Sequence, residues 1–328
     1  MDFQKAVELI DNSKNILITT HIRPDGDACG CVAVMAETLT DVGKKVKSLL
    51  LSPLPEWYEF LFAEKPAVLG DDVTLEQLKA DTFFKPDLII IVDTNSYNQL
   101  PTFSDYLKKK DCPILIIDHH VTSDGLGDVE LVEPAAAATG LILFDFLKYA
   151  GWQMSPEATE ALFLAIATDT GWFRFTNTDA RVHRSCAELI DAGAKPTRIY
   201  HDLYQNFSHQ RFKLMIAMLN TLELHLDGRY AAQHIVQADF KQAGAAPKDT
   251  ENLIDECQRI SSVEVAALFV ELEDGRVKCA LRSRGAVDVR RTAAKFGGGG
   301  HTMAAGVHLP GPMKNAKKLI KAEIEKQL

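Results

Sequence analysis

Short apolar runs, almost free of polar interruptions, recur at regular intervals in the first half of the chain. The strongest are residues 15–20, 87–92 and 113–117, with weaker runs at 45–51 and 129–132. Such runs are typical of strands buried on both faces of a parallel sheet. Stretches with helical periodicity lie among them, at residues 3–12, 28–42, 138–150 and 156–167. This alternation predicts an α/β fold with a doubly wound, mostly parallel sheet.

The pattern changes after about residue 179, where helical stretches follow one another without strands. Beyond them a smaller α+β unit is predicted, with helices at 250–258, 287–296 and 312–327 and strands at 222–226, 230–237, 263–271, 276–282 and 304–308. The Asp227-Gly228 and Asp274-Gly275 pairs separate strand-like runs, which is a hairpin signal. We therefore predict a first domain at 1–190, a helical connector at 191–220 and a second domain at 221–328.

Length and composition agree with two soluble domains. The chain has 328 residues, of which 46% are hydrophobic and 25% charged, and a domain takes about 150 residues. Apolar runs stay well short of the ~20 residues that cross a bilayer, and the N-terminus lacks a signal-peptide pattern. The six cysteines are scattered, and Cys29-x-Cys31 alone is a weak zinc signal, so we expect reduced thiols and a cytoplasmic protein without a membrane partner.

The net charge of −9 argues against binding to long duplex nucleic acid, which requires a broad basic field. It does not exclude a small substrate that carries phosphate. The oligomeric state stays open, and a homodimer through the first domain is compatible with the pattern.

Acidic residues and histidines gather just beyond the predicted strands. They are His21, Asp25, Asp27, Asp93, Asp118, His119, His120 and, after the apolar stretch 161–167, Asp169. Parallel sheets bind ligands beyond the carboxyl ends of their strands, so these groups are expected at one sheet edge. Each element alone is more often a turn, a helix cap or a surface histidine, but together they hold more negative charge than a site without cations tolerates.

The kinds of ligand narrow the choice of metal. Mixed imidazole and carboxylate ligands suit Mn²⁺, Zn²⁺ or Fe²⁺ better than Mg²⁺, which prefers oxygen. A carboxylate shared by two ions would hold them ~3.5–4 Å apart, the spacing that two-metal phosphoryl chemistry uses.

The second half contains a glycine run, Gly297–Gly300, followed by His301. Backbone N–H groups of such a run can converge on an anion, although a flexible loop is the commoner role for glycines alone. Basic residues nearby favour an anion site; they are Arg282, Arg284, Arg290, Arg291 and Lys295. Arg290 and Arg291 also fit a solvated helix face. His183, His201, His209, His225 and His234 are expected to be structural or exposed, and Trp172, Phe173 and Phe175 to be core or interface residues rather than base-stacking ones.

Several of these segments together resemble the DHH phosphoesterase superfamily. The motifs are HIRPDGDACG at 21–30, VDT at 92–94, DHH at 118–120 and TDTGWF at 168–173, in the family's order. The C-terminal LRS at 281–283 and FGGGGHTMAAG at 296–306 resemble the family's DHHA1 substrate domain. Length and motif order are most similar to the small bacterial members that act as oligoribonuclease and 3′-phosphoadenosine 5′-phosphate (PAP) phosphatase.

The resemblance implies two Mn²⁺ ions that share Asp93. His21 and Asp25 would complete the first site, while Asp27, His119 and Asp169 would complete the second. His120 would face the substrate phosphate as a hydrogen-bond donor or general acid, and Asp118 would orient a neighbouring histidine. Cys31 departs from the serine that is common in this family, a change that leaves the ligand set intact.

The same resemblance implies a function. Substrate contacts would come from Arg282, Ser283, Gly298, Gly299, Gly300 and His301. The expected substrates are short RNA, cleaved to mononucleotides, and PAP, cleaved to AMP and phosphate. The main alternative is a soluble phosphodiesterase of pApA or cyclic dinucleotides. A non-catalytic nucleotide- or RNA-binding module is a remote alternative, since the metal ligands are all present.

Overall fold

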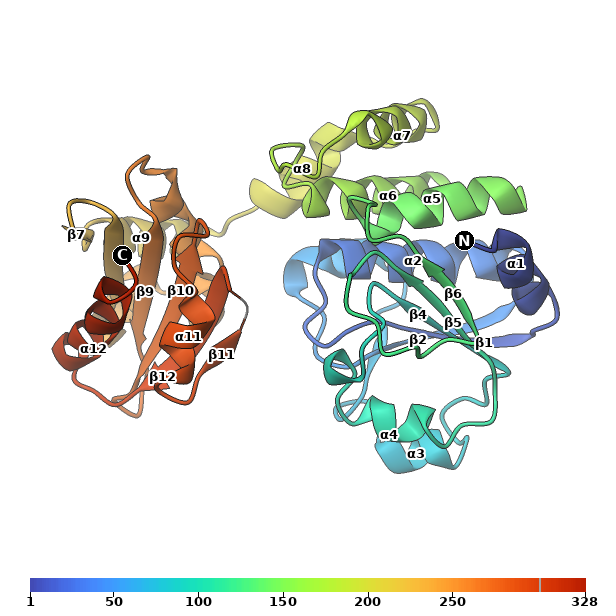
Figure 1. The fold of residues 1–328 in the computed structure, drawn as a ribbon, viewed down its shortest axis with the longest axis horizontal. Helices are drawn as coiled ribbons and strands as arrows, with labels where there is room; N and C mark the ends of the chain where they lie inside the picture. The colour runs from blue at the N-terminus through green and yellow to red at the C-terminus, as the bar shows by residue number, and fades with distance from the viewer. Residues whose placement is uncertain (301) are drawn as a thin grey trace. The chain divides into compact units, whose positions relative to one another are not determined.

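A parallel sheet of six strands forms the centre of the N-terminal unit, Met1–Asn206, in the computed structural model, which describes residues 1–300 and 302–328 (Figure 1). Its strand order is β3-β2-β1-β4-β5-β6. The strands are β1 (Asn15–Thr19), β2 (Lys45–Leu50), β3 (Ala67–Val68), β4 (Leu88–Val92), β5 (Ile114–Asp118) and β6 (Val129–Val132). The α/β class and the doubly wound parallel sheet that the apolar runs predict are therefore confirmed.

Helices cover both faces of this sheet (Figure 1). One face packs against α2 (Gly26–Asp41), with α5 (Thr139–Ala150) and α6 (Pro156–Asp169) beyond it, and the other against α3 (Leu75–Lys79) and α4 (Phe103–Leu107). Alternate residues of one strand serve the two cores, so Ile16 and Ile18 lie in the first and Leu17 in the second. The remaining helices are α1 (Phe3–Asp11), α7 (Ala180–Asp191), α8 (Pro196–Tyr204) and the 3₁₀ turns η1 (Glu56–Leu61) and η2 (Tyr97–Gln99).

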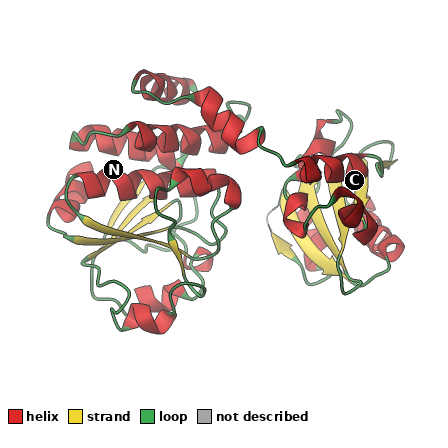
Figure 2. Ribbon diagram, turned by 180° about the vertical axis from the view of Figure 1, so that it is seen from behind, coloured by secondary structure: helices red, strands yellow, loops and turns green. Residues whose placement is uncertain are grey.

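The second unit, Phe207–Leu328, is built on a mixed sheet of order β11-β12-β10-β9-β8-β7 (Figure 2). Its strands are β7 (Glu223–His225), β8 (Tyr230–Ile235), β9 (Val265–Glu271), β10 (Val277–Ser283), β11 (Gly299–Gly300) and β12 (Ala304–Leu309). Both hairpins expected at the Asp-Gly pairs are present, β7–β8 and β9–β10. The helices are α9 (His209–Leu219), α10 (Gln237–Ala243), η3 (Pro247–Thr250), η4 (Leu253–Arg259), α11 (Val289–Ala294) and α12 (Met313–Glu325).

Several elements differ from the sequence prediction. The predicted strand 230–237 ends at Ile235, and α10 begins at Gln237 instead. The predicted helix 250–258 is mostly the 3₁₀ turn η4, and the glycine run includes a short strand, β11. No helix within residues 1–300 and 302–328 combines the length and the hydropathy needed to span a bilayer.

The close packing of α2 on α6 depends on a glycine. A Cβ atom on Gly30 would lie 2.6 Å from the Ala161 carbonyl oxygen and 2.9 Å from the Ala165 Cβ. Both distances are shorter than real Cβ contacts, so any side chain would push the two helices apart. Since α2 carries two of the expected metal ligands, this contact also fixes their position.

We predict that Gly30→Ala destabilises the protein by about 1–3 kcal/mol, the cost of overpacking a well-packed core. Gly306→Ala is the matched control, because a Cβ on Gly306 would lie 3.8 Å from its nearest neighbour, the Cys279 carbonyl oxygen. Urea unfolding of both variants measures the difference. Equal stability of the two variants would contradict the packing argument.

Candidate metal centre

The expected ligands lie where the strand order of the first sheet reverses. β1 is followed along the chain by β2 on one side, whereas β4 on its other side is followed by β5 and β6. Such a reversal is the usual ligand site of a doubly wound sheet. His21 follows β1, Asp93 follows β4, and His119 follows β5. The topology thus brings segments from three strand ends to one place.

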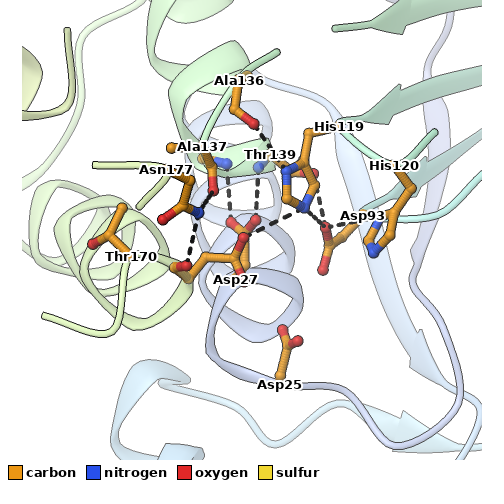
Figure 3. Close-up of polar contacts among 12 residues, drawn as sticks. Asp25, Asp27, Asp93, His119, His120, Ala136, Ala137, Thr139, Thr170 and Asn177 are labelled. Carbon is orange, nitrogen blue, oxygen red and sulfur yellow. Dashed lines mark hydrogen bonds and ion pairs between the residues drawn. The ribbon is translucent and has the colours of Figure 1, made fainter. Parts of the chain in front are cut away.

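Asp93 lies between His119 and His120 in the cluster (Figure 3). Its backbone has φ of +61°, a left-handed conformation that is costly for a residue with a side chain. The Asp93 N–H donates a 2.8 Å hydrogen bond to the Ile117 carbonyl, which holds the residue at the end of β4. Its carboxylate is buried, with Oδ2 3.3 Å from His21 Nε2 and Oδ1 3.6 Å from His119 Nε2. The backbone is therefore strained to keep this carboxylate between the two imidazoles.

Both of these histidines present the same ring nitrogen to the cluster. The Nδ1 atom of His21 lies 3.0 Å from the Ile22 carbonyl oxygen, and that of His119 lies 3.1 Å from the Ala136 carbonyl oxygen. A carbonyl only accepts, so each Nδ1 carries the proton and donates it. In the neutral ring, Nε2 then keeps its lone pair and faces the carboxylates. Histidines that bind metals are commonly oriented in this way.

Asp25 and Asp27 are placed by the start of α2. Asp25 is the N-cap, and its Oδ1 accepts from the Ala28 N–H at 3.1 Å. Asp27 is buried in the first turn and accepts from the Thr139 N–H at 2.6 Å and the Gly140 N–H at 2.9 Å. These donors are the first N–H groups of α5, which a helix leaves without internal partners. Two helix N-termini thus stabilise the negative charge of the cluster.

Asp169 reaches the cluster from a helix, in agreement with the helix predicted at 156–167. It is the last residue of α6, so it comes from a helix end and not from a strand edge. Its Oδ2 lies 3.4 Å from His119 Nε2. The helix supplies this ligand because α6 packs on α2, which holds Asp27.

Three overlapping groups have potential ligand atoms within 4.8 Å of one another, as partly drawn in Figure 3. They are His21 with Asp25 and Asp93, Asp27 with His119 and Asp169, and Asp93 with His119 and His120. The structure therefore brings together every residue of the predicted metal set. It differs from the predicted division in two respects, because Asp93 is not grouped with Asp27, His119 and Asp169, and because His120 also lies beside Asp93.

The carboxylates of the cluster cannot all stay ionised without cations. Burial, with the neighbouring Asp93, Asp169 and Asp25, raises the pKa of Asp27 well above its usual range. The pKa of Asp93 is raised in the same direction by burial and by Asp25, and burial raises the pKa of Asp169 to about 6. A divalent cation would reverse each effect, since it favours the ionised carboxylates. The donor set, carboxylate oxygens with the Nε2 atoms of His21 and His119, fits such an ion.

Asp118 and His120 form a separate pair at the edge of the cluster. Asp118 is fully buried, and its Oδ1 accepts from His120 Nδ1 at 2.8 Å and from the His120 backbone N–H at 3.1 Å. The hydrogen bond with Asp118 raises the pKa of His120 to about 8. His120 is half exposed, so its ring is accessible to a ligand. Asp118 therefore orients a histidine that is protonated at neutral pH.

Two contacts to the carboxylates of Asp93 and Asp27 were not predicted from the sequence. The Thr139 hydroxyl donates a 2.8 Å hydrogen bond to Asp93 Oδ1, so one residue contacts both buried carboxylates. Cys31 Sγ lies 3.4 Å from Asp27 Oδ1, one helical turn away on α2. The only sequence signal for Thr139 was its position at the start of a predicted helix.

The predicted substrate residues lie on β10 and beside β12 in the second unit. Arg282 Nε donates to Asp255 Oδ1 at 3.2 Å, and the side chain is partly exposed. The Ser283 hydroxyl is buried and accepts from the Gly285 N–H at 3.0 Å, which closes a turn. His301 lies outside the described residues.

Packing against β12 explains why glycine occupies part of the run Gly297–Gly300. A Cβ on Gly298 would lie 2.4 Å from the Gly306 carbonyl oxygen, and one on Gly300 would lie 2.4 Å from that of Ala304. Gly299 and Gly300 pair with β12 as β11. Close approach to β12 thus requires glycine at two of these positions, whereas Gly299 has open space around it and is exposed.

Comparison with known proteins identifies the family of this chain. The family described as "DHH family, N-terminal domain" matches residues 15–168, and the DHHA1 domain matches residues 227–328. A relative from Thermus thermophilus, named "Bifunctional oligoribonuclease and PAP phosphatase NrnA", is 30% identical over 90% of this chain and 84% of its own. The chain therefore belongs to the DHH family and carries its DHHA1 domain. The resemblance expected from the motifs is confirmed.

Solved structures share the fold. An exopolyphosphatase-related protein from Bacteroides fragilis has a TM-score of 0.89 at 23% identity, covering 99% of this chain and 95% of that chain. The exonuclease RecJ bound to manganese has a TM-score of 0.55 at 16% identity, covering 98% of this chain and 94% of that chain. At these identities the likeness concerns the fold.

We predict that Asp93→Asn raises the thermal stability of the metal-free protein. Removing a buried charge that repels its neighbours should stabilise the fold by about 1 kcal/mol or more, which is ~2–4 °C for a domain of this size. Added Mn²⁺ should raise the melting temperature of the wild type much more than that of the variant.

The matched control is Asp71→Asn, since Asp71 is exposed and outside the cluster. Its melting temperature should equal that of the wild type with and without Mn²⁺. A metal-free Asp93→Asn protein that melts below the wild type, yet gains as much from Mn²⁺, would refute the electrostatic account of the cluster.

Proposed function

We propose that this protein is a Mn²⁺-dependent phosphoesterase that hydrolyses short oligoribonucleotides to mononucleotides and PAP to AMP and phosphate. The observation that carries this proposal is the shared position of Asp93, which belongs to two of the three potential ligand groups. The name of the Thermus thermophilus relative, which matches most of this chain, supports the substrate class. The six free cysteines support a reducing compartment, the cytoplasm.

Each of the two ions would be held by a distinct group of residues. We assign the first to His21, Asp25 and Asp93, and the second to Asp27, Asp93, His119 and Asp169. When bound, such a metal pair activates a water molecule as nucleophile and neutralises the phosphate oxygens. Manganese suits the mixed oxygen and imidazole donors, and manganese is also what the related fold of RecJ was solved with.

The chain's own contribution to the reaction includes a proton donor. His120 is cationic at neutral pH because Asp118 accepts its Nδ1 proton. We assign it to the substrate phosphate, where it donates a hydrogen bond or passes its Nε2 proton to the leaving oxygen. Asp118 keeps the ring in the orientation that this role requires.

The second unit would recognise the nucleotide. We assign this role to Arg282 and Ser283 of β10 and to Gly298, Gly299, Gly300 and His301. Arg282 has a partly exposed guanidinium, which can form two parallel hydrogen bonds to a phosphate. Gly299 is exposed, and a Cβ placed on it would meet no atom within 4 Å, so the backbone there is open to a ligand. The net charge of −9 favours substrates of a few nucleotides over long ones.

We predict that Asp93→Ala abolishes Mn²⁺-dependent hydrolysis, by a factor of about 10³ or more, because the variant loses the ligand common to both ions. The assay compares PAP, pApA, pyrophosphate and RNA of two to five nucleotides, with product analysis. Hydrolysis of dinucleotides that survived this change would make the two-metal assignment wrong. Rates that are highest on pApA would favour the dinucleotide phosphodiesterase instead.

A second prediction separates binding of substrate from binding of metal. Arg282→Ala should raise KM about tenfold or more through the loss of a charged hydrogen bond, while Mn²⁺ stoichiometry stays that of the wild type. Arg276→Ala is the control, since Arg276 is an exposed arginine that pairs with Asp274 in the adjacent hairpin turn. Loss of metal in Arg282→Ala would contradict the assignment of separate roles to the two units.

A further inference from the structure

The second unit contains a groove that the proposed catalytic function does not use. It has a volume of about 550 Å³ and lies between the β7–β8 hairpin and α12. Four lysines of α12 line it, namely Lys314, Lys317, Lys318 and Lys321. Their spacing of three and four residues places them on one face of the helix. A row of positive charge thus borders a concave surface in a chain whose net charge is −9.

This arrangement of lysines costs stability in the free protein. Like charges at i and i+4 repel on a helix, and both Lys314 with Lys318 and Lys317 with Lys321 are so spaced. Lys314 also lies in the first turn, where the helix dipole disfavours cations, and no side chain caps this helix. Within residues 1–300 and 302–328, neither Lys314 nor Lys318 forms an ion pair. An anion in the groove would relieve each of these costs.

A buried hydroxyl in the same groove provides independent support. Tyr230 lines the groove and is 1% exposed. Among the described residues its hydroxyl has no hydrogen-bond partner. Burial holds the pKa of Tyr230 well above its usual range, so the hydroxyl keeps its proton. A buried polar group without a partner costs about 1–3 kcal/mol, and a ligand in the groove would supply the partner.

The rest of the groove is lined by aromatic and apolar side chains together with Glu223 and His234. The His225 ring stacks on Tyr230 with centroids 5.8 Å apart, and Ala232 and Met313 also line the groove. Lys317 Nζ donates to Glu223 at 2.8 Å and approaches His234 Nδ1 at 3.0 Å, which fixes one lysine in place. The groove therefore offers ammonium groups from α12, one of them paired with Glu223, and an aromatic and apolar surface from β8 and Met313.

This groove is distinct from the substrate residues assigned above. β7 and β11 are the two edge strands of the six-stranded sheet, and Figure 1 shows them on opposite sides of this unit. With strands about 4.8 Å apart, the edges are separated by roughly 24 Å. The glycine run and the lysine groove thus cannot contact the same nucleotide.

We propose that the lysine groove is a second, non-catalytic binding site for a nucleoside phosphate. The phosphate would lie along the lysines of α12, with the nucleoside against Tyr230, His225 and Met313. The groove volume is within the range of small-molecule sites, ~300–1,000 Å³. Lysine ammoniums act as point charges for phosphate. The occupant is either a free nucleotide or a terminal nucleotide of RNA.

The test uses the full chain in EDTA. Hydrogen–deuterium exchange measures protection of the backbone, and calorimetry measures affinity. The ligands are AMP, a 5′-phosphorylated RNA trinucleotide, adenosine and inorganic phosphate. AMP or the trinucleotide should protect residues 223–234 and 313–321. Lys314→Glu with Lys318→Glu should weaken this binding at least tenfold and leave PAP hydrolysis unchanged. Protection by AMP alone identifies a free nucleotide as the occupant, whereas protection by the trinucleotide identifies an RNA end.

The matched control is Lys213→Glu with Lys241→Glu, which makes the same charge change at exposed lysines on α9 and α10. It should bind AMP as the wild type does. A second variant, Tyr230→Phe, should fold normally and bind AMP several-fold more weakly. The proposal is overturned if residues 223–234 and 313–321 gain no protection. It is also overturned if their protection survives the lysine reversal or is lost equally in the control. Binding of adenosine or phosphate alone that is as tight as binding of AMP would overturn it as well. All of these readouts are independent of hydrolysis.

Discussion

The structure of the first unit depends on one electrostatic constraint, the confinement of several carboxylates in a small, largely buried volume around Asp93. Like charges at such distances cannot all stay ionised without compensation. The fold provides part of it, because the N-termini of α2 and α5 donate backbone hydrogen bonds to Asp25 and Asp27. Divalent cations would provide the rest. The left-handed backbone of Asp93 and the tight packing of α2 on α6 both follow from keeping this geometry.

The same constraint explains why the histidines are arranged as they are. Carbonyl oxygens of Ile22 and Ala136 accept the Nδ1 protons of His21 and His119, so these rings present Nε2 to the carboxylates. His120 is the exception, because buried Asp118 raises its pKa and keeps it cationic. The cluster therefore combines two imidazoles whose Nε2 atoms face the carboxylates with one cationic imidazole suited to phosphate. His119 and His120 are neighbours in one motif, yet they differ in role. The reason is that Nδ1 of His119 donates to a carbonyl oxygen, whereas Nδ1 of His120 donates to the Asp118 carboxylate.

Much of this organisation could be predicted from sequence because it is local. Apolar runs of strand length followed directly by Asp93 or His119 indicate both the sheet and its ligand edge. Contacts distant in sequence could not be predicted in this way. The bonds from Thr139 and Gly140 to Asp27 join residues more than a hundred positions apart, and Asp169 arrives through helix packing. The pairing of the glycine run with β12 and the groove that His225 and His234 line also depend on contacts distant in sequence.

The central claim is that the cluster holds two cations that share Asp93. Anomalous diffraction from crystals grown with Mn²⁺ tests it directly, since manganese is located independently of any assumption about ligands. The account predicts two peaks at full occupancy on either side of the Asp93 carboxylate, one bound by His21 and Asp25 and the other by Asp27, His119 and Asp169. A single peak, or peaks that lack Asp93 as a common ligand, would contradict it.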